Sequence, residues 1–171
     1  MKTKIARLNH IASLAIVASL MALLMTQPVY ACGGTPGKVT GGGQIPTWDS
    51  PVIPAGSFGF NIMFYPDKGM VVPKGELEFI DHTEGWNVHG HDMTSLVVVG
   101  PPKGNLPWTA RFEGECTVNG EEGFRFVVWV EDWGEPGKND IFQLEFFKGA
   151  FFYCTGPLPT LLAGNIQIHK K

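Results

Sequence analysis

The stretch "GSFGFNIMF", residues 56–64, decides the fold class because its apolar side chains recur at every second position. These side chains are Phe58, Phe60, Ile62 and Phe64. Successive side chains of a β-strand point to opposite faces, so a period of two indicates a strand with one buried face. We therefore predict a strand here that turns its phenylalanine face toward a core.

The same period recurs through the rest of the chain. Further alternating sets are Phe124, Phe126, Val128 and Val130; Phe142, Leu144 and Phe146; and Ile166 and Ile168. Asn119-Gly120 and Lys148-Gly149 are hairpin turn signals, and residues 132–140 form a longer loop. The sequence predicts an all-β fold, a single antiparallel β-sandwich, jelly-roll-like or a partly closed barrel, of roughly nine to ten short strands.

Residues 1–31 have the organisation of an export signal. Lys2, Lys4 and Arg7 precede the apolar run 11–25, and Ala31 ends a small-residue cleavage site. The apolar run is shorter than the ~18–20 residues that a membrane-spanning helix needs. We expect a signal peptide over 1–31, a flexible N-terminus over 32–37, and one domain over 38–171 in a secreted or cell-envelope protein.

Removal of this signal leaves an acidic chain. The signal holds three of the 13 Lys and Arg residues and none of the 16 Asp and Glu residues, so the net charge after cleavage is −6. Nucleic-acid binding depends on basic patches that neutralise phosphates. The sequence therefore predicts no nucleic-acid partner.

Three cysteines remain from the cleavage point onward. Cys116 and Cys154 lie in β-like stretches, which allows a disulfide between neighbouring strands, and the alternative is two buried reduced thiols. Cys32 follows Val29-Tyr30-Ala31, which is similar to a bacterial lipoprotein cleavage box except at Tyr30. Lipidation of Cys32 would anchor the protein and would account for the odd cysteine.

The segment "DHTEGWNVHGHD", residues 81–92, is the best metal candidate in the sequence. His82, His89, His91 and Asp81 supply imidazole and carboxylate groups that suit zinc, and His89 and His91 share a face if no bulge occurs at Gly90. The alternative is a polar hairpin turn in which Asp81 and His82 bond turn amides.

Two loop features are further candidates. Asp132, Glu135 and Asp140 offer the oxygen ligands that calcium prefers, or they belong to a solvated hairpin tip. Tryptophans in or beside the predicted loops could stack on sugars or on a partner protein, or could cover the ends of the sandwich. They are Trp48, Trp86, Trp108 and Trp133.

Several stretches resemble, in order, the post-COAP family of exported β-rich domains associated with choice-of-anchor proteins. They are "KVTGGGQI", "GSFGFNIMF", "GELEFIDHTEGWNVHG", "CTVNG", "EDWGEPGKND" and "GNIQIHK", which together span Lys38 to Lys170. The resemblance implies an extracellular or envelope-associated β-sandwich with no assigned activity. Trp86, the two cysteines 116 and 154, and the segment 100–108 depart from the family pattern.

No sequence motif of catalysis accompanies these features. The chain lacks a Gly-x-Ser-x-Gly elbow, a phosphate loop and a dinucleotide fingerprint. We predict a non-catalytic structural or binding domain whose partner is a cell-surface glycan or an envelope protein. The alternatives are a carbohydrate-binding module that uses Trp86, Trp108 and Trp133, and a metal-binding protein or metal-dependent hydrolase centred on the histidines.

Overall fold

Alternation of apolar and polar residues produces nine strands in the described part of the chain. The computed structural model describes residues 37–47, 54–67, 70–101 and 105–169. The strands are β1 (Lys38–Ile45), β2 (Gly56–Asp67), β3 (Met70–Asp81), β4 (Asn87–Val99), β5 (Trp108–Val118), β6 (Glu121–Asp132), β7 (Ile141–Lys148), β8 (Phe151–Cys154) and β9 (Ala163–His169). The expected signal, the lipidation candidate Cys32 and Trp48 lie outside the described residues.

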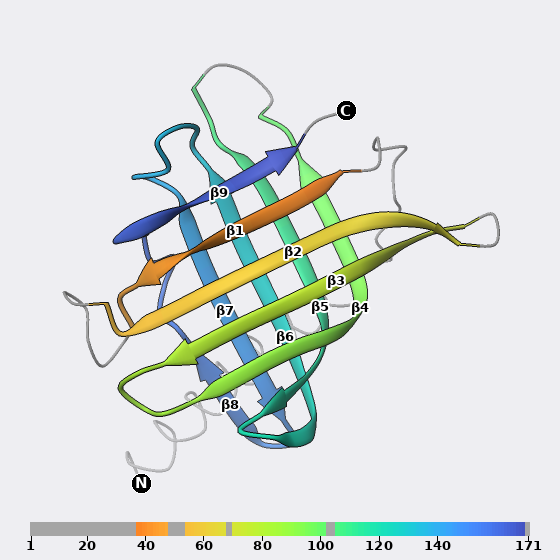
Figure 1. The fold of residues 1–171 in the computed structure, drawn as a ribbon, viewed down its shortest axis with the longest axis vertical. Helices are drawn as coiled ribbons and strands as arrows, with labels where there is room; N and C mark the ends of the chain where they lie inside the picture. The colour runs from red at the N-terminus through yellow and green to blue at the C-terminus, as the bar shows by residue number, and fades with distance from the viewer. Residues whose placement is uncertain (1–36, 48–53, 68–69, 102–104, 170–171) are drawn as a thin grey trace, which may run out of the picture. The chain divides into compact units, whose positions relative to one another are not determined.

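All nine strands belong to one antiparallel sheet (Figure 1). Its order is β8-β7-β6-β5-β4-β3-β2-β1-β9, so each strand from β1 to β8 lies beside the next one in the chain. The exception is β9, which returns to pair with β1, where Val39 lies opposite Ile168. Among the described residues, β8 and β9 are therefore the two edge strands of this sheet. No helix that could span a membrane occurs within the described ranges.

The sheet curls because β4 belongs to both of its halves. The first part of β4, from Asn87 to Gly90, pairs with β3, whereas its last part, from Ser95 to Val99, pairs only with β5. The register with β5 shifts between these two parts, after His91, and such an irregularity bends a strand. In Figure 1, β9, β1, β2 and β3 accordingly cross in front of β5, β6 and β7 at a steep angle.

The two halves of the sheet enclose one aromatic core. Phe142 on β7 stacks against Phe58 on β2 with ring centroids 3.9 Å apart, and it lies 6.1 Å from Phe60 and 6.5 Å from Phe79. Gly90 faces the same core, where a Cβ atom would lie 2.8 Å from the ring of Phe126. The absence of a side chain at this position therefore lets the halves approach where the sheet bends.

The structure confirms the predicted fold class. The described strands are all antiparallel, and their curled sheet is the partly closed barrel form of the prediction. The alternating sets are buried as expected, including the four of β6 and the two of β9, with Phe64 packed half-buried against the core. The predicted turn at Asn119 and Gly120 also forms, with φ values of 50° and 80° that suit a two-residue hairpin.

Candidate ligand-binding pocket

Two carboxylates join the segment between β6 and β7 to the edge strand β9. Asp140 accepts hydrogen bonds from the backbone N–H of Trp133 at 2.9 Å and of Ile166 at 2.8 Å. Asp132 accepts from the backbone N–H of Gly134 and of Ile168, both at 2.9 Å. Edge strands normally expose such N–H groups to pairing with another chain. Here the loop carboxylates satisfy two of them and fix the loop in place.

Asp140 is fully buried beneath this loop. Burial raises the pKa of its carboxyl group, and the nearby Asp132 and Glu135 charges raise it further, while the N–H groups of Trp133 and Ile166 lower it. The effect of burial is the largest of these, so ionising this carboxyl group in the folded protein costs more free energy than it does in water. A buried acid with both oxygens bonded to backbone amides is a structural element of the loop.

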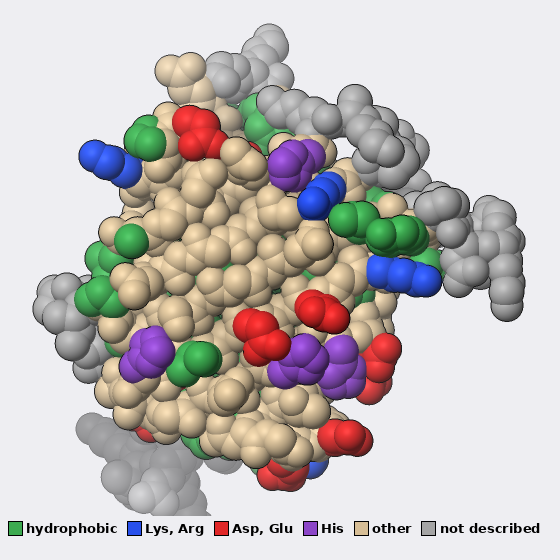
Figure 2. Space-filling view, viewed as in Figure 1, with side chains coloured by type: hydrophobic (Ala, Val, Ile, Leu, Met, Phe, Trp, Pro, Cys, Tyr) green, Lys and Arg blue, Asp and Glu red, His purple; other side chains and the backbone are tan. Residues whose placement is uncertain are grey.

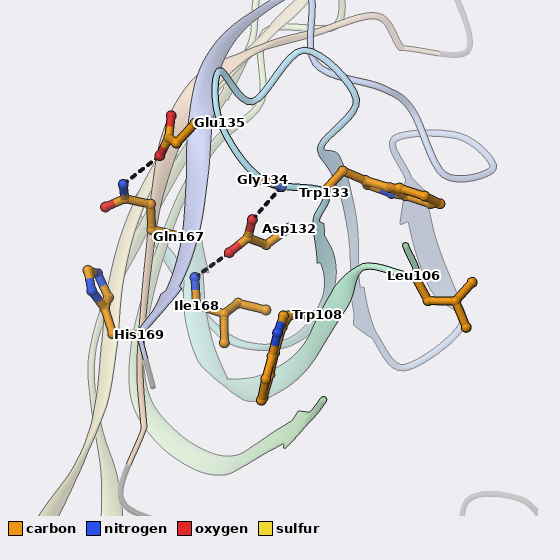
Figure 3. A pocket seen from close by; sticks show the side chains of 9 residues that line it. All are labelled: Leu106, Trp108, Asp132, Trp133, Gly134, Glu135, Gln167, Ile168 and His169. Atoms are coloured by element: carbon orange, nitrogen blue, oxygen red, sulfur yellow. Dashed lines mark hydrogen bonds between the residues drawn. The ribbon is translucent and has the colours of Figure 1, made fainter. Parts of the chain in front are cut away.

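Beside this junction lies a pocket of about 410 Å³, which we call the β9 pocket (Figure 3). Its lining comes from the segment before β5, from the β6–β7 loop and from β9: Leu106, Trp108, Asp132, Trp133, Gly134, Glu135, Gln167, Ile168 and His169. Figure 3 shows an apolar side and a polar side, with Leu106 and the two tryptophans on one side of β9 and Glu135, Gln167 and His169 on the other. The volume is in the range of pockets for small ligands.

Hydrogen bonds set the orientation of the polar side. Glu135 Oε1 accepts from Gln167 Nε2 at 2.7 Å and from Asn165 Nδ2 at 3.1 Å. These two hydrogen bonds lower the pKa of Glu135, so the exposed carboxylate is ionised at neutral pH. The ring of His169 has Nε2 3.0 Å from Thr40 Oγ1 on β1.

The apolar side offers two aromatic rings at different depths. Trp133 is 44% exposed, and its indole Nε1 donates to Glu131 Oε2 at 2.9 Å. Trp108 is half-buried and packs against the core. Indole rings present flat apolar faces, and none of the nine lining residues is Lys or Arg. The pocket is thus suited to a neutral or positively charged ligand with an apolar face and polar edges.

The structure gives the calcium candidates Asp132, Glu135 and Asp140 other partners. Both oxygens of Asp132 and of Asp140 accept backbone hydrogen bonds, and Glu135 binds two side-chain amides. Within the described ranges, no group of three or more His, Cys, Asp or Glu side chains is arranged to hold a metal ion.

The predicted zinc ligands of the segment 81–92 lie in different places in the structure. Asp81 is fully buried and accepts from the backbone N–H of Thr83 at 2.8 Å and of Glu84 at 2.9 Å, and also from the hydroxyl of Tyr153. His82 turns toward β2, with Nε2 3.0 Å from Ser57 Oγ. The predicted set of four therefore does not meet at one point; only His89 and His91 remain side by side on the outer face, with ring centroids 6.1 Å apart.

The contact between Tyr153 and Asp81 ties β8 to the end of β3, and its removal is expected to lower stability. Tyr153→Phe should cost about 2 kcal/mol in unfolding free energy, because a hydrogen bond to a buried carboxylate is lost. The ring should keep its stacking on Phe146 at 4.7 Å. Urea denaturation measures the change, with Tyr65→Phe on the exposed β2 surface as the matched control. Equal midpoints for both variants would contradict this role.

The third predicted ligand-binding tryptophan lies away from the β9 pocket. Trp86 is half-buried and packs edge-on against Phe146 and Phe151, with centroid distances of 6.1 Å and 5.6 Å. Its ring closes the core near the β3–β4 turn. Of the tryptophans predicted to bind ligand, Trp108 and Trp133 are therefore the two that the pocket brings together.

The predicted disulfide is not formed. Cys116 and Cys154 are free thiols on β5 and β8, and strands β6 and β7 lie between them. Adjacent strands are about 4.8 Å apart, so three steps across the sheet exceed the ~4.4–6.8 Å that a disulfide allows between Cα atoms. Burial also raises the pKa of the Cys116 thiol to about 12, which leaves it protonated.

Sequence reasoning missed the contribution of β9 to the pocket. The alternation in "GNIQIHKK" indicates that Gln167 and His169 point away from the core, but it does not show which loop lies beside them. Leu106 was likewise missed because it belongs to an irregular segment before β5.

Comparison with known proteins returned no matching family model, no matching curated protein and no matching solved structure. The resemblance to the post-COAP family stays a prediction.

Proposed function

We propose that this protein is an exported, non-catalytic binding domain that holds a carbohydrate in the β9 pocket. The observation that carries the proposal is that Trp108 and Trp133, from two different strand ends, line one pocket together with Glu135 and Gln167. Sugars combine apolar C–H faces with polar hydroxyl edges. The lining supplies tryptophan rings for the first and amide and carboxylate groups for the second.

The fixed geometry of the loop supports this proposal. A ligand gains most from side chains that are already in position, since fewer rotamers must be ordered on binding. Trp133 is held through its indole N–H and its backbone N–H, and Glu135 is held by two amides. The pocket therefore needs little rearrangement to accept a ligand.

The negative charge of the pocket lining favours neutral and amino sugars over acidic ones. Two carboxylates and no Lys or Arg line the pocket. Uronic or sialic acids would face repulsion from Asp132 and Glu135, whereas neutral sugars and amino sugars would not. We expect neutral or amino-sugar oligosaccharides to bind more tightly than acidic ones.

A glycan array followed by calorimetry tests the proposal. Trp133→Ala is expected to weaken binding of the best glycan at least about tenfold, because a central aromatic contact is lost. Trp129→Ala is the matched control, since Trp129 is 37% exposed on β6 and does not line the pocket. Failure of the wild type to bind any glycan, or an equal loss in both variants, would overturn the proposal.

A further inference from the structure

A second group of polar side chains gathers on the outer face of the sheet, away from the β9 pocket. On β4, Val88 and Gly90 are buried, so His89 and His91 point outward. Glu78 on β3 lies opposite His89. Figure 2 shows histidine side chains next to one another on this face, with acidic side chains beside them.

One nitrogen of each imidazole is held by a carboxylate. Nδ1 of His89 contacts the Glu78 carboxylate, and Nδ1 of His91 lies 3.0 Å from Asp92 Oδ2. A carboxylate at this position keeps the ring proton on Nδ1, which leaves the lone pair of Nε2 available as a metal ligand. The arrangement is that of the carboxylate–histidine pairs that support metal ions.

The spacing of the two rings suits a shared ion. Their centroids are 6.1 Å apart and their planes are inclined by 37°. Two imidazoles on one tetrahedral zinc ion have ring centres roughly 5 Å apart, because each Zn–N bond is about 2.0–2.1 Å. A movement of the rings by about 1 Å closes this difference. Both side chains are partly exposed, at 44% and 34%, which leaves room for such a movement.

We propose that His89 and His91 form a two-imidazole surface site for a divalent transition metal such as Zn²⁺ or Cu²⁺. Imidazole nitrogen suits these ions, whereas Ca²⁺ and Mg²⁺ prefer oxygen. Because the described residues hold no arrangement of three or more ligands, water completes the coordination and the ion exchanges readily. Glu78 and Asp92 position the rings and offset the charge of the ion. The site is independent of the β9 pocket.

Calorimetric titration of the full-length secreted protein with ZnCl₂ and CuCl₂ tests this site. We expect one ion per chain for the wild type and no binding of CaCl₂. His89→Ala and His91→Ala should each abolish the binding isotherm. His82→Ala is the matched control, because His82 belongs to the same hairpin but turns toward Ser57, and it should bind as the wild type does.

The metal affinity of the Glu78→Gln variant tests whether the Glu78 carboxylate orients His89 for metal binding. Loss of the carboxylate that orients His89 should weaken metal affinity about tenfold or more. His89→Gln keeps a polar side chain at this partly exposed position and guards against an effect of alanine on folding. Absence of Zn²⁺ and Cu²⁺ binding in the wild type, or unchanged binding in both His89 variants, would overturn the proposal.

Discussion

Replacing Phe142 with alanine is expected to destabilise the protein by about 3–5 kcal/mol. Phe142 is fully buried and lies between the two halves of the curled sheet, within 6.5 Å of the rings of Phe58, Phe60 and Phe79. Its removal leaves a cavity that rings from two other strands cannot fill without moving the sheet. Urea denaturation monitored by tryptophan fluorescence gives the change in unfolding free energy.

Phe152→Ala is the control for this prediction. Phe152 has the same ring but is 60% exposed on the edge strand β8. Its removal should change the unfolding free energy by less than about 1 kcal/mol. A cost for Phe142→Ala no larger than that for Phe152→Ala would contradict the account of one core between two halves of a sheet.

Asp140→Ala is expected to cost about 3 kcal/mol and to loosen the β9 pocket. The variant leaves the N–H groups of Trp133 and Ile166 without their acceptor, and the Ile166 donor is buried, where an unsatisfied N–H group costs most. Asp140→Asn should recover part of the loss, because its amide oxygen can accept one of the two bonds. Glu84→Ala, in the exposed β3–β4 turn, should be within about 0.5 kcal/mol of the wild type. An Asp140→Ala protein as stable as Glu84→Ala would refute this role.

The same carboxyl group links stability to pH in a defined direction. Because burial raises the pKa of Asp140, the folded protein binds this proton more tightly than the unfolded chain does. The stability contributed by this group is fully present below the unfolded pKa and is lost as pH rises through the raised pKa of the folded state. The difference in unfolding free energy between wild type and Asp140→Ala should therefore widen as pH falls through this range.

The core of the fold could be predicted because the alternation of apolar residues within each strand indicates which of its side chains are buried. Phe58, Phe60 and Ile62 alternate along β2, and all three are buried. Neighbouring strands joined by short turns pair with one another, which explains the order from β1 to β8. Local patterns were sufficient where the relevant contacts are local.

The closure of the sheet could not be predicted in this way. The pairing of β9 with β1 joins the two ends of the domain, and the bend in β4 depends on an irregularity after His91. The sequence indicates the acidic residues at and after the end of β6. It does not indicate that Asp132 and Asp140 accept hydrogen bonds from backbone N–H groups of β9. An alternation pattern shows which face a residue occupies and gives no information on which distant strand lies beside it.

The candidate sites divide along the same line. Aromatic residues in predicted loops indicate binding sites, and this criterion selects Trp108 and Trp133, which line the pocket. The same criterion selects Trp86, which packs against the core instead. The shared face of His89 and His91 follows from a period of two. The separation of His82 from them depends on its contact with Ser57, 25 residues earlier in the chain.

An NMR titration of the five indole N–H resonances with the best glycan from the array tests binding in the β9 pocket most directly. We expect the indole signals of Trp108 and Trp133 to shift and to saturate with increasing sugar concentration, while those of Trp86 and Trp129 keep their positions. Shifts at Trp86 or Trp129 without shifts at Trp108 and Trp133 would show that the ligand binds elsewhere and would contradict binding in the β9 pocket.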